Sequence, residues 1–289
     1  MTAWNYEAPA PTAALLAAHG VPERRAVFLG SPVDPLTMDE TLAVIDDAMG
    51  RRVPLKHVVV NVSKLMSMRR DPALRGDVCG SDLINIDGMG VVWGARLAGI
   101  RVPGRVAGID LMDRVLGLCA AKGYRPYILG ARREVLENAV AAIRRRHPGI
   151  TFAGWRDGYF GPTEEPEVVE AIRQSGADCL FVAISSPMKE RFTQQHRDRL
   201  GVPFLMGVGG SIDVFAGHTR RAPVWVQNAG MEWFFRMAQE PRRLWRRYLS
   251  TNCVYLGLLA GEVVRARRRA APVSPGPGER PPLHRKPML

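Results

Sequence analysis

The sequence lacks the spacings that mark metal-binding and disulfide-stabilised proteins. Its four cysteines, Cys79, Cys119, Cys179 and Cys253, lie 40, 60 and 74 residues apart and form no CxxC pair. The six histidines are scattered and form no HExxH motif. Such spacings indicate neither a zinc site nor a disulfide framework. We therefore expect reduced thiols, no metal site and no cofactor.

Long apolar runs are also missing. The longest uncharged stretch near the C-terminal end runs from Tyr248 to Gly261 and has 14 residues, whereas a helix needs about 20 to span a bilayer. Residues 1–24 are rich in Ala and Pro, and they lack the basic region and the long apolar run of a secretory signal. We predict a loose leader over residues 1–24 and no membrane-spanning segment.

Two familiar nucleotide-binding motifs are absent as well. No predicted strand is followed by GxGxxG with an acidic residue about 20 positions later, which disfavours a nucleotide-dependent dehydrogenase. The segment Gly207–Ser211 is rich in glycine but lacks the Lys-Ser/Thr pair of a P-loop.

Positive charge, by contrast, is abundant. The 289 residues include 40 Lys and Arg against 28 Asp and Glu, a formal net charge of +12. This excess favours anionic partners, which are nucleic acid, acidic lipid or phosphate-bearing substrates. The content of 46% hydrophobic and 24% charged residues is that of an ordinary globular protein. A chain of this length buries a sizeable core without disulfides.

Arginine is concentrated in the C-terminal region, where residues 231–269 contain nine arginines and three glutamates. On a helical wheel, four of them share one face opposite apolar and aromatic residues, and these are Arg242, Arg243, Arg246 and Arg247. Such a face favours contact with anionic lipid or with a diphosphate; the alternative is a solvated face of a helix packed on the domain. We predict a helical membrane or acceptor appendage over residues 229–269 and a disordered Pro-rich tail over residues 270–289.

Between residues 25 and 228, short apolar runs alternate with segments of helical periodicity. The expected strands are Ala26–Leu29, His57–Val60, Leu83–Ile86, Pro126–Leu129, Ile150–Ala153, Cys179–Ile184 and Phe204–Val208. Near-continuous apolar strands separated by helices are typical of a mostly parallel sheet covered on both faces. We therefore predict an α/β, Rossmann-like core over residues 25–228.

Polar residues that follow the predicted strands are the candidate functional residues, because ligands of such sheets bind beyond the carboxyl ends of the strands. They are Asn61, Asp87, Gly130, Ser185–Glu190 and Gly209–Asp213. Asp87 is a candidate general base if burial raises its pKa, and a structural Asp-Gly turn is the alternative. Gly130 precedes a helix whose first backbone N–H groups are suited to hold a phosphate.

Several longer segments carry a family resemblance. They are VVVNVSKLM with Asn61, INIDGMGVVW with Asp87, RVAGIDLM with Arg105, GWRDGYFG, SSPMKERF, and a long block that begins GVGGSIDVFAGHTRRAPVWVQNAGMEWFF. Together they resemble the WecG/TagA/CpsF glycosyltransferases of bacterial envelope and exopolysaccharide assembly. The similarity extends over about residues 25–255.

The resemblance implies an inverting, metal-independent transfer of a sugar from a nucleotide-sugar, usually UDP-linked. The implied acceptor is a sugar on a polyprenyl diphosphate at the cytoplasmic face of the membrane, so the protein is expected to be cytoplasmic and peripheral to that face. The resemblance also implies a homo-oligomer with a C-terminal appendage that completes the site.

The same resemblance assigns roles to individual residues. Asp87 corresponds to the base that deprotonates the acceptor, Asn61 to a contact with sugar or acceptor, and Arg105 to a partner of donor phosphate or acceptor charge. The candidate donor-binding positions are Gly130, Tyr159, Ser186, Pro187, Lys189, Glu190, Gly209 and Asp213. The candidate acceptor or membrane contacts are Arg221, Arg242, Arg243, Arg246 and Arg247.

The sequence departs from the family pattern at two positions. Many members have Thr two residues before the Asn, whereas this chain has Val59. Many also have Pro-x-Gln-Glu, whereas this chain has Lys189 in place of the Gln. A cation there is suited to a phosphate contact or to an acidic sugar or acceptor. The chain also resembles a branch of the family associated with exopolysaccharide synthesis, which implies glucose and glucuronic acid as alternatives to N-acetylmannosamine as the donor sugar.

Two other classes of protein remain as alternatives. A nucleic-acid-binding protein fits the basic composition, but no nucleic-acid-binding motif is present and the arginines lie in an amphipathic, aromatic-bearing segment. A non-catalytic scaffold of a polysaccharide assembly complex fits the basic appendage, and it has no use for Asp87. We favour the glycosyltransferase and expect no nucleic-acid partner.

Overall fold

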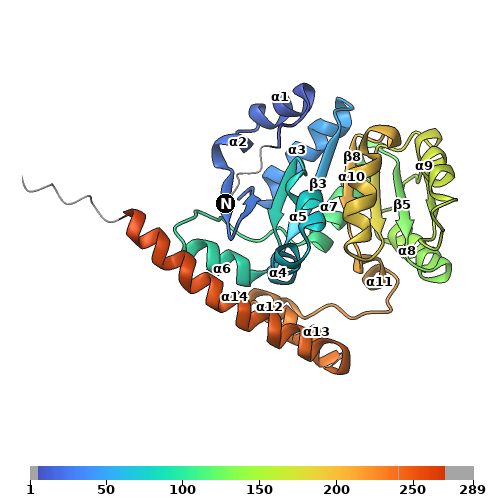
Figure 1. Ribbon diagram of the computed structural model, residues 1–289. Coiled ribbons are helices and arrows are strands. Elements are labelled where there is room, and N and C mark those ends of the chain that lie inside the picture. Colours follow the sequence, from blue (N-terminus) through green and yellow to red (C-terminus); the bar gives the residue numbers. More distant parts are fainter. Residues whose placement is uncertain (1–5, 240, 271–289) are drawn as a thin grey trace, which may run out of the picture.

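A computed structural model describes residues 6–239 and 241–270 of the chain (Figure 1). At residues 228, 236, 241–244, 246–249 and 267–270 the description covers the backbone alone. The predicted tail lies outside the described residues, apart from residue 270, which ends the last helix.

The core is a six-stranded sheet in the order β4-β3-β8-β7-β5-β6, with every neighbouring pair parallel. The strands are β3 (Leu55–Val60), β4 (Leu83–Ile86), β5 (Pro126–Gly130), β6 (Gly154–Arg156), β7 (Cys179–Ala183) and β8 (Phe204–Gly207). All residues of β4, β5 and β7 are buried, as expected for strands covered on both faces. The prediction of a parallel, Rossmann-like α/β fold is confirmed.

Helices cover both faces of the sheet (Figure 1). One face packs against α3 (Met38–Gly50), α7 (Gly108–Lys122) and α8 (Arg133–Arg146) through one apolar cluster. The other face packs against α4 (Val62–Arg70), α5 (Pro72–Cys79), α6 (Met89–Leu97), α9 (Glu165–Gln174) and α10 (Met188–Leu200) through two more clusters. In the strands other than β6, alternate residues point to the two faces. In β3, for example, Leu55 belongs to the first cluster and Val58 to the second.

The leader prediction is wrong for most of residues 1–24. Residues in this segment form α1 (Ala10–Ala18) and α2 (Val21–Arg24). Leu15, Leu16 and Val21 are buried in the cluster that also contains residues of α3. An alanine-rich segment has high helix propensity, and burial of two adjacent leucines supplies the tertiary stabilisation that a short helix needs.

Two of the predicted strands are misplaced. Residues Ala26–Phe28 form β1, which pairs antiparallel with β2 (Ser31–Val33) in a separate hairpin and not with the main sheet. The strand expected at Ile150–Ala153 is β6 at Gly154–Arg156. Ile150 and Phe152 are buried in the core without being in a strand, so their apolar character reports packing and not strand pairing.

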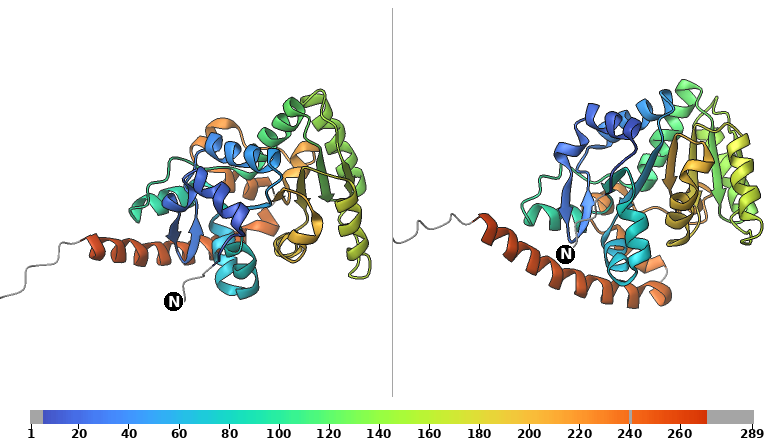
Figure 2. Two further views of the ribbon diagram at one scale, coloured as in Figure 1. Left: turned by 90° about the horizontal axis from the view of Figure 1, so that it is seen from above. Right: turned by 45° about the horizontal axis from the view of Figure 1, so that its top comes forward.

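The C-terminal region is helical, and its last helix lies against α4 and α6 on the second face of the core. It contains α12 (Val224–Asn228), α13 (Glu232–Gln239) and the 30-residue α14 (Pro241–Ala270). Figures 1 and 2 show α14 as a long rod that passes α4 and α6 and continues beyond the core. The buried Tyr255 anchors it, because its hydroxyl donates a hydrogen bond to the backbone O of Gly90 at 2.7 Å. Within residues 6–239 and 241–270, no helix is both long enough and apolar enough to cross a membrane.

Candidate active site

The candidate residues gather along the carboxyl edge of the sheet. Asn61 follows β3 and Asp87 follows β4, and these strands pair in parallel with Val60 opposite Ile86. A Cβ placed on Gly88 is 3.8 Å from the Cβ of Asn61, so the two strand ends lie side by side. Gly88 has φ of 104°, a conformation that favours glycine. This turn sets Asp87 at the rim of the sheet.

Asn61 has a structural role of its own. Its Oδ1 accepts a hydrogen bond from the backbone N of Lys64 at 3.0 Å, which caps the N-terminus of α4. The cap fixes the side chain next to Asp87 and leaves the amide Nδ2 available as a donor. Asn61 therefore orders the entrance to α4 and presents one donor group at the site.

Asp87 is a half-buried carboxyl group with an altered pKa. Burial, reinforced by the negative charge of Glu232, raises the pKa of Asp87 to about 6, although the positive charges of Arg105 and Lys64 act in the opposite direction. Its backbone N donates to the O of Val60 at 2.8 Å, which holds the residue in register with β3. A carboxylate with a pKa near 6 is ionised at neutral pH and is a better proton acceptor than an ordinary aspartate.

Arginine pairs tie the C-terminal helices to the core beside Asp87. Arg105 donates hydrogen bonds to Glu232 of α13 and, at 3.1 Å, to Oε1 of Gln227 in α12. Arg221 forms a bidentate pair with Asp110 of α7 and donates to the same Gln227 oxygen at 3.0 Å. The predicted acceptor contact Arg221 thus binds a core carboxylate and links α12 to α7.

A second charged cluster lies at the centre of the carboxyl edge. The ammonium of Lys64, from α4, is 2.7 Å from Oε1 of Glu190 in α10, and the ammonium of Lys189 bonds to the same oxygen. Lys189 and Glu190 are buried. Two cations therefore share one carboxylate, which leaves one positive charge in excess.

The pKa values reflect this arrangement. Burial, with the neighbouring charge of Lys64, lowers the pKa of Lys189 to about 8. Burial opposes the ionisation of Glu190, but the two ammonium groups outweigh this effect and lower the pKa of Glu190 to about 2. The other carboxylate oxygen of Glu190, Oε2, is buried and has no hydrogen-bond partner among the described residues. A buried acceptor of this kind is suited to a hydroxyl group of a ligand.

The remaining donor candidates follow the other strands at the same edge. Gly130 ends β5, and Ser186 and Pro187 follow β7 and are exposed. A Cβ at Gly130 would approach the backbone of Ala183 to 2.4 Å, so only glycine fits between β5 and β7. Tyr159, after β6, is largely exposed and accepts a hydrogen bond from Nε of Arg132 at 3.4 Å.

Gly209 and Asp213 complete this edge. Gly209 follows β8, and a Cβ there lies 3.9 Å from Cε of Lys189, which places the turn directly over the lysine cluster. Asp213 is half-buried in α11 (Ser211–Phe215), and its backbone O accepts from the N of His218 at 2.9 Å. The structure thus brings the donor candidates to one edge, with Asp87 and Asn61 at the β3–β4 end.

The four arginines of the predicted appendage fall in α14, but their side chains lie outside the described residues; they are Arg242, Arg243, Arg246 and Arg247. The structure therefore places only their backbone. In the part of the chain that is described, no three His, Cys, Asp or Glu side chains cluster in a way that would hold a metal ion.

Four residues of the site were not singled out from the sequence. They are Lys64, Asp110, Gln227 and Glu232, which contact Glu190, Arg221 and Arg105. Lys64 and Asp110 stand inside the motifs VVVNVSKLM and RVAGIDLM, beside residues that were selected. Gln227 and Glu232 stand inside the long block that begins at Gly207, but nothing local pairs them with Arg105, which lies 122 and 127 residues away in sequence.

A parallel α/β sheet with a raised-pKa carboxylate and a set of cations at its carboxyl edge is typical of an enzyme site that binds anionic ligands. The sequence model of the glycosyl transferase WecG/TagA/CpsF family matches residues 26–269. The chain belongs to this family, as the sequence motifs predicted, and it is a glycosyltransferase. Family membership favours the glycosyltransferase over the scaffold and nucleic-acid alternatives.

Two relatives carry the same name, N-acetylglucosaminyldiphosphoundecaprenol N-acetyl-beta-D-mannosaminyltransferase. The protein from Bacillus subtilis (strain 168) is 36% identical over 182 residues, which are 63% of this chain and 70% of the relative. The protein from Bacillus spizizenii (strain ATCC 23059 / NRRL B-14472 / W23) is 35% identical over 181 residues, which are 63% and 69% of the two chains.

Proposed function

We propose that this glycosyltransferase moves a sugar from a UDP-sugar to a sugar carried on a polyprenyl diphosphate, with inversion and without a metal ion. The names of the relatives support an acceptor of this kind, because they describe a sugar on diphosphoundecaprenol. The observation that carries the proposal is the position of Asp87, a base with a pKa near 6 beside Arg105 and Lys64.

The chemistry is a single displacement. The Asp87 carboxylate takes the proton of the acceptor hydroxyl as its oxygen attacks the anomeric carbon of the donor sugar. The bond from that carbon to the UDP oxygen breaks, and the electron pair leaves with UDP. Because attack and departure occur on opposite faces, the anomeric configuration inverts.

Protein cations take the role of stabilising the leaving diphosphate. Lys64 and Lys189 supply one positive charge in excess of Glu190 at the centre of the edge. Arg105 is a further cation, and its partner in this structure is the carboxylate of Glu232. A diphosphate that displaces Glu232 would receive a charge-assisted, bidentate contact from Arg105. The negative charge that develops on the leaving UDP therefore lies next to cations that are already in position.

The C-terminal helices suit an acceptor that is embedded in a lipid surface. Val254, Leu256 and Val264 of α14 are exposed apolar side chains, and the predicted arginine face belongs to the same helix. Apolar residues next to basic ones favour an anionic membrane surface. We place the enzyme at the inner face of the cell membrane, as a homo-oligomer that contributes to polysaccharide synthesis.

A UDP-release assay tests the proposal. The enzyme is incubated in EDTA with each of a panel of UDP-sugars and a short-chain prenyl-diphosphate sugar acceptor. We expect acceptor-dependent UDP release with one donor, and analysis of the product linkage should show inversion. A requirement for added Mg²⁺ or Mn²⁺ would contradict the metal-independent mechanism, and transfer from a donor that is not a UDP-sugar would contradict the donor class.

A further inference from the structure

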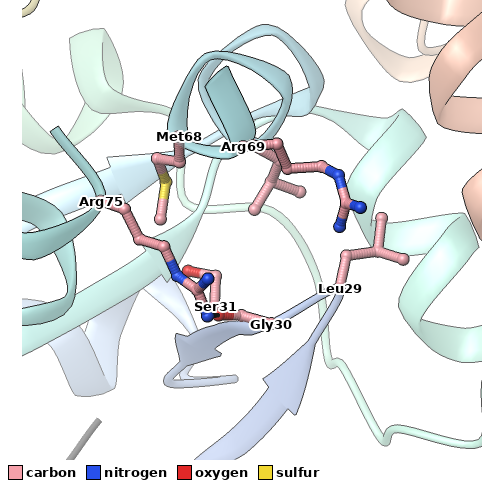
Figure 3. A pocket seen from close by; sticks show the side chains of 7 residues that line it. Leu29, Gly30, Ser31, Met68, Arg69 and Arg75 are labelled. Atoms are coloured by element: carbon pink, nitrogen blue, oxygen red, sulfur yellow. Dashed lines mark hydrogen bonds between the residues drawn. The ribbon is translucent and has the colours of Figure 1, made fainter. Parts of the chain in front are cut away.

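A small cavity lies between α4, α5 and the turn of the β1–β2 hairpin (Figure 3). The centres of water-sized molecules can occupy about 30 Å³ of it, and the cavity opens to solvent. None of the residues assigned above to the active site lines it. This volume is far below that of small-molecule pockets, so the cavity has room for a single phosphate-sized group and not for a whole nucleotide-sugar.

Two guanidinium groups face this cavity. Figure 3 shows the guanidinium of Arg75, from α5, at Gly30 and Ser31, and that of Arg69, from the last turn of α4, on the Leu29 side of the same cavity. Nη2 of Arg75 donates to the backbone O of Gly30 at 3.1 Å, which holds that guanidinium in place. Among the described residues, neither arginine forms an ion pair with a carboxylate. The cavity therefore carries two positive charges and no countercharge.

Three of the other side chains that line the cavity are apolar. Leu29, Leu65 and Met68 line it, and all three are buried. Guanidinium groups bind phosphate oxygens in a planar, bidentate geometry. The apolar side chains are suited to a hydrocarbon chain attached to such a phosphate. This combination matches a phosphate ester that carries an apolar substituent.

The cavity also adjoins the helix that we propose to lie at the membrane. Its three apolar residues belong to the cluster against which Tyr255, Leu258 and Leu259 of α14 pack. The outer side of α14 exposes Val254 and Leu256. A lipid surface that contacts α14 would therefore bring phosphate headgroups close to Arg69.

We propose that the cavity between Arg69 and Arg75 is a phosphate-binding site, separate from the active site, that takes the phosphate of an anionic lipid headgroup or of a free phosphate ester. This inference goes beyond the proposed transfer reaction and uses none of its residues.

The test compares three single substitutions in the full-length enzyme. Arg69→Gln removes a guanidinium for which the structure shows no protein hydrogen bond, so it should leave the fold intact. Arg75→Gln removes the second guanidinium together with its bond to Gly30. Arg70→Gln is the matched control, because it removes the same charge from the same helix end at an exposed residue that does not line the cavity. Thermal unfolding of each variant checks that it is folded.

Each variant is titrated with inorganic phosphate by calorimetry and, separately, with vesicles of phosphatidylcholine with and without phosphatidic acid. We expect Arg69→Gln to weaken binding of at least one phosphate probe by about tenfold, the loss of one charge-assisted contact, and Arg70→Gln to change it by less than about twofold in the phosphate titration. An effect confined to vesicles identifies a lipid headgroup, and an equal effect on both probes identifies a free phosphate ester. Equal losses in Arg69→Gln and Arg70→Gln, or no binding of either probe by the unsubstituted enzyme, would overturn the proposal.

The assay of UDP release keeps this result separate from the transfer reaction. With a soluble short-chain acceptor and no membrane, Arg69→Gln should turn over at the unsubstituted rate. A loss of turnover there would show that Arg69 belongs to the active site and would also overturn the proposal.

Discussion

Glu232 of α13 forms an ion pair with Arg105, and the two residues act in opposite directions on the pKa of Asp87. The C-terminal helices therefore contribute directly to the electrostatics of the candidate base. Gln227 reinforces the connection, because its side-chain oxygen accepts hydrogen bonds from both Arg105 and Arg221.

Substitution of Glu232 by Gln should shift the pH dependence of the reaction. The negative charge of Glu232 raises the pKa of Asp87, whose value is about 6, and its removal also frees Arg105, which lowers that pKa. Asp87 should then stay ionised to a lower pH, so the acidic limb of kcat/KM against pH should move to lower pH. Glu262→Gln is the control, since Glu262 pairs with Arg265 on α14. A shift toward higher pH would contradict the assigned role of Glu232.

Substitution of Lys189 by Gln should change how stability depends on pH. The folded protein lowers the pKa of Lys189 from 10.5 to about 8. Between these values the unfolded chain binds more protons, so the free energy of unfolding rises with pH there. Lys189→Gln should reduce this rise in urea unfolding measured from pH 8 to pH 10. Part of the rise should remain, because burial also lowers the pKa of Lys56 to about 8.

Lys122→Gln is the control for that measurement. Lys122 bonds to Asp46, and this contact raises its pKa above the ordinary lysine value. Its substitution should leave the slope between pH 8 and pH 10 unchanged. An unchanged slope in Lys189→Gln as well would show that the ammonium of Lys189 is not buried in the folded enzyme.

Asn61 offers a test that separates capping from catalysis. Asn61→Ala removes the hydrogen bond to the N of Lys64 and should cost about 1 kcal/mol of stability. Asn61→Ser keeps an N-cap oxygen and should be close to the unsubstituted enzyme in stability. Both variants lose the amide donor, so both should lose activity if Asn61 contacts a substrate. Full activity of Asn61→Ser would limit the residue to capping.

The contact between α14 and the core depends on a glycine in α6. A Cβ at Gly94 would approach the hydroxyl oxygen of Tyr255 to 2.1 Å. Gly94→Ala should therefore displace α14, with faster hydrogen exchange and easier proteolysis in that helix. Gly257→Ala is the matched control, because a Cβ there meets nothing within 4 Å and should stabilise the helix by up to about 1 kcal/mol. Equal protection of α14 in the two variants would contradict the packing described here.

The sequence pattern was sufficient to predict the parallel sheet and the placement of Asn61 and Asp87. Both follow apolar strands that are covered on two faces, and such strands are visible as short uninterrupted runs. The pattern failed at Ile150–Ala153 and in the N-terminal segment, where Leu15 and Leu16 are buried against α3. In both places the apolar residues report tertiary packing, which a local pattern does not distinguish from strand pairing.

The charged partners of the site were harder to predict, for a physical reason. Glu190 sits between Lys64 and Lys189, and Lys64 lies 126 residues away in sequence. The same holds for Glu232 and Arg105. The chain brings these residues together only when α4, α10 and α13 pack around the sheet, so the family motifs marked some of the residues and not their pairing.

The most direct measurement is the turnover of Asp87→Asn together with its affinity for UDP. Removal of a general base typically costs about 10²- to 10⁴-fold in rate, whereas UDP is expected to contact the lysine cluster and not Asp87. The account predicts a fall in kcat of this size with a nearly unchanged Kd for UDP. The melting temperature at neutral pH should not fall, because the raised pKa of Asp87 means that folding disfavours its ionised form. Turnover close to that of the unsubstituted enzyme would contradict the assignment of Asp87 as the base.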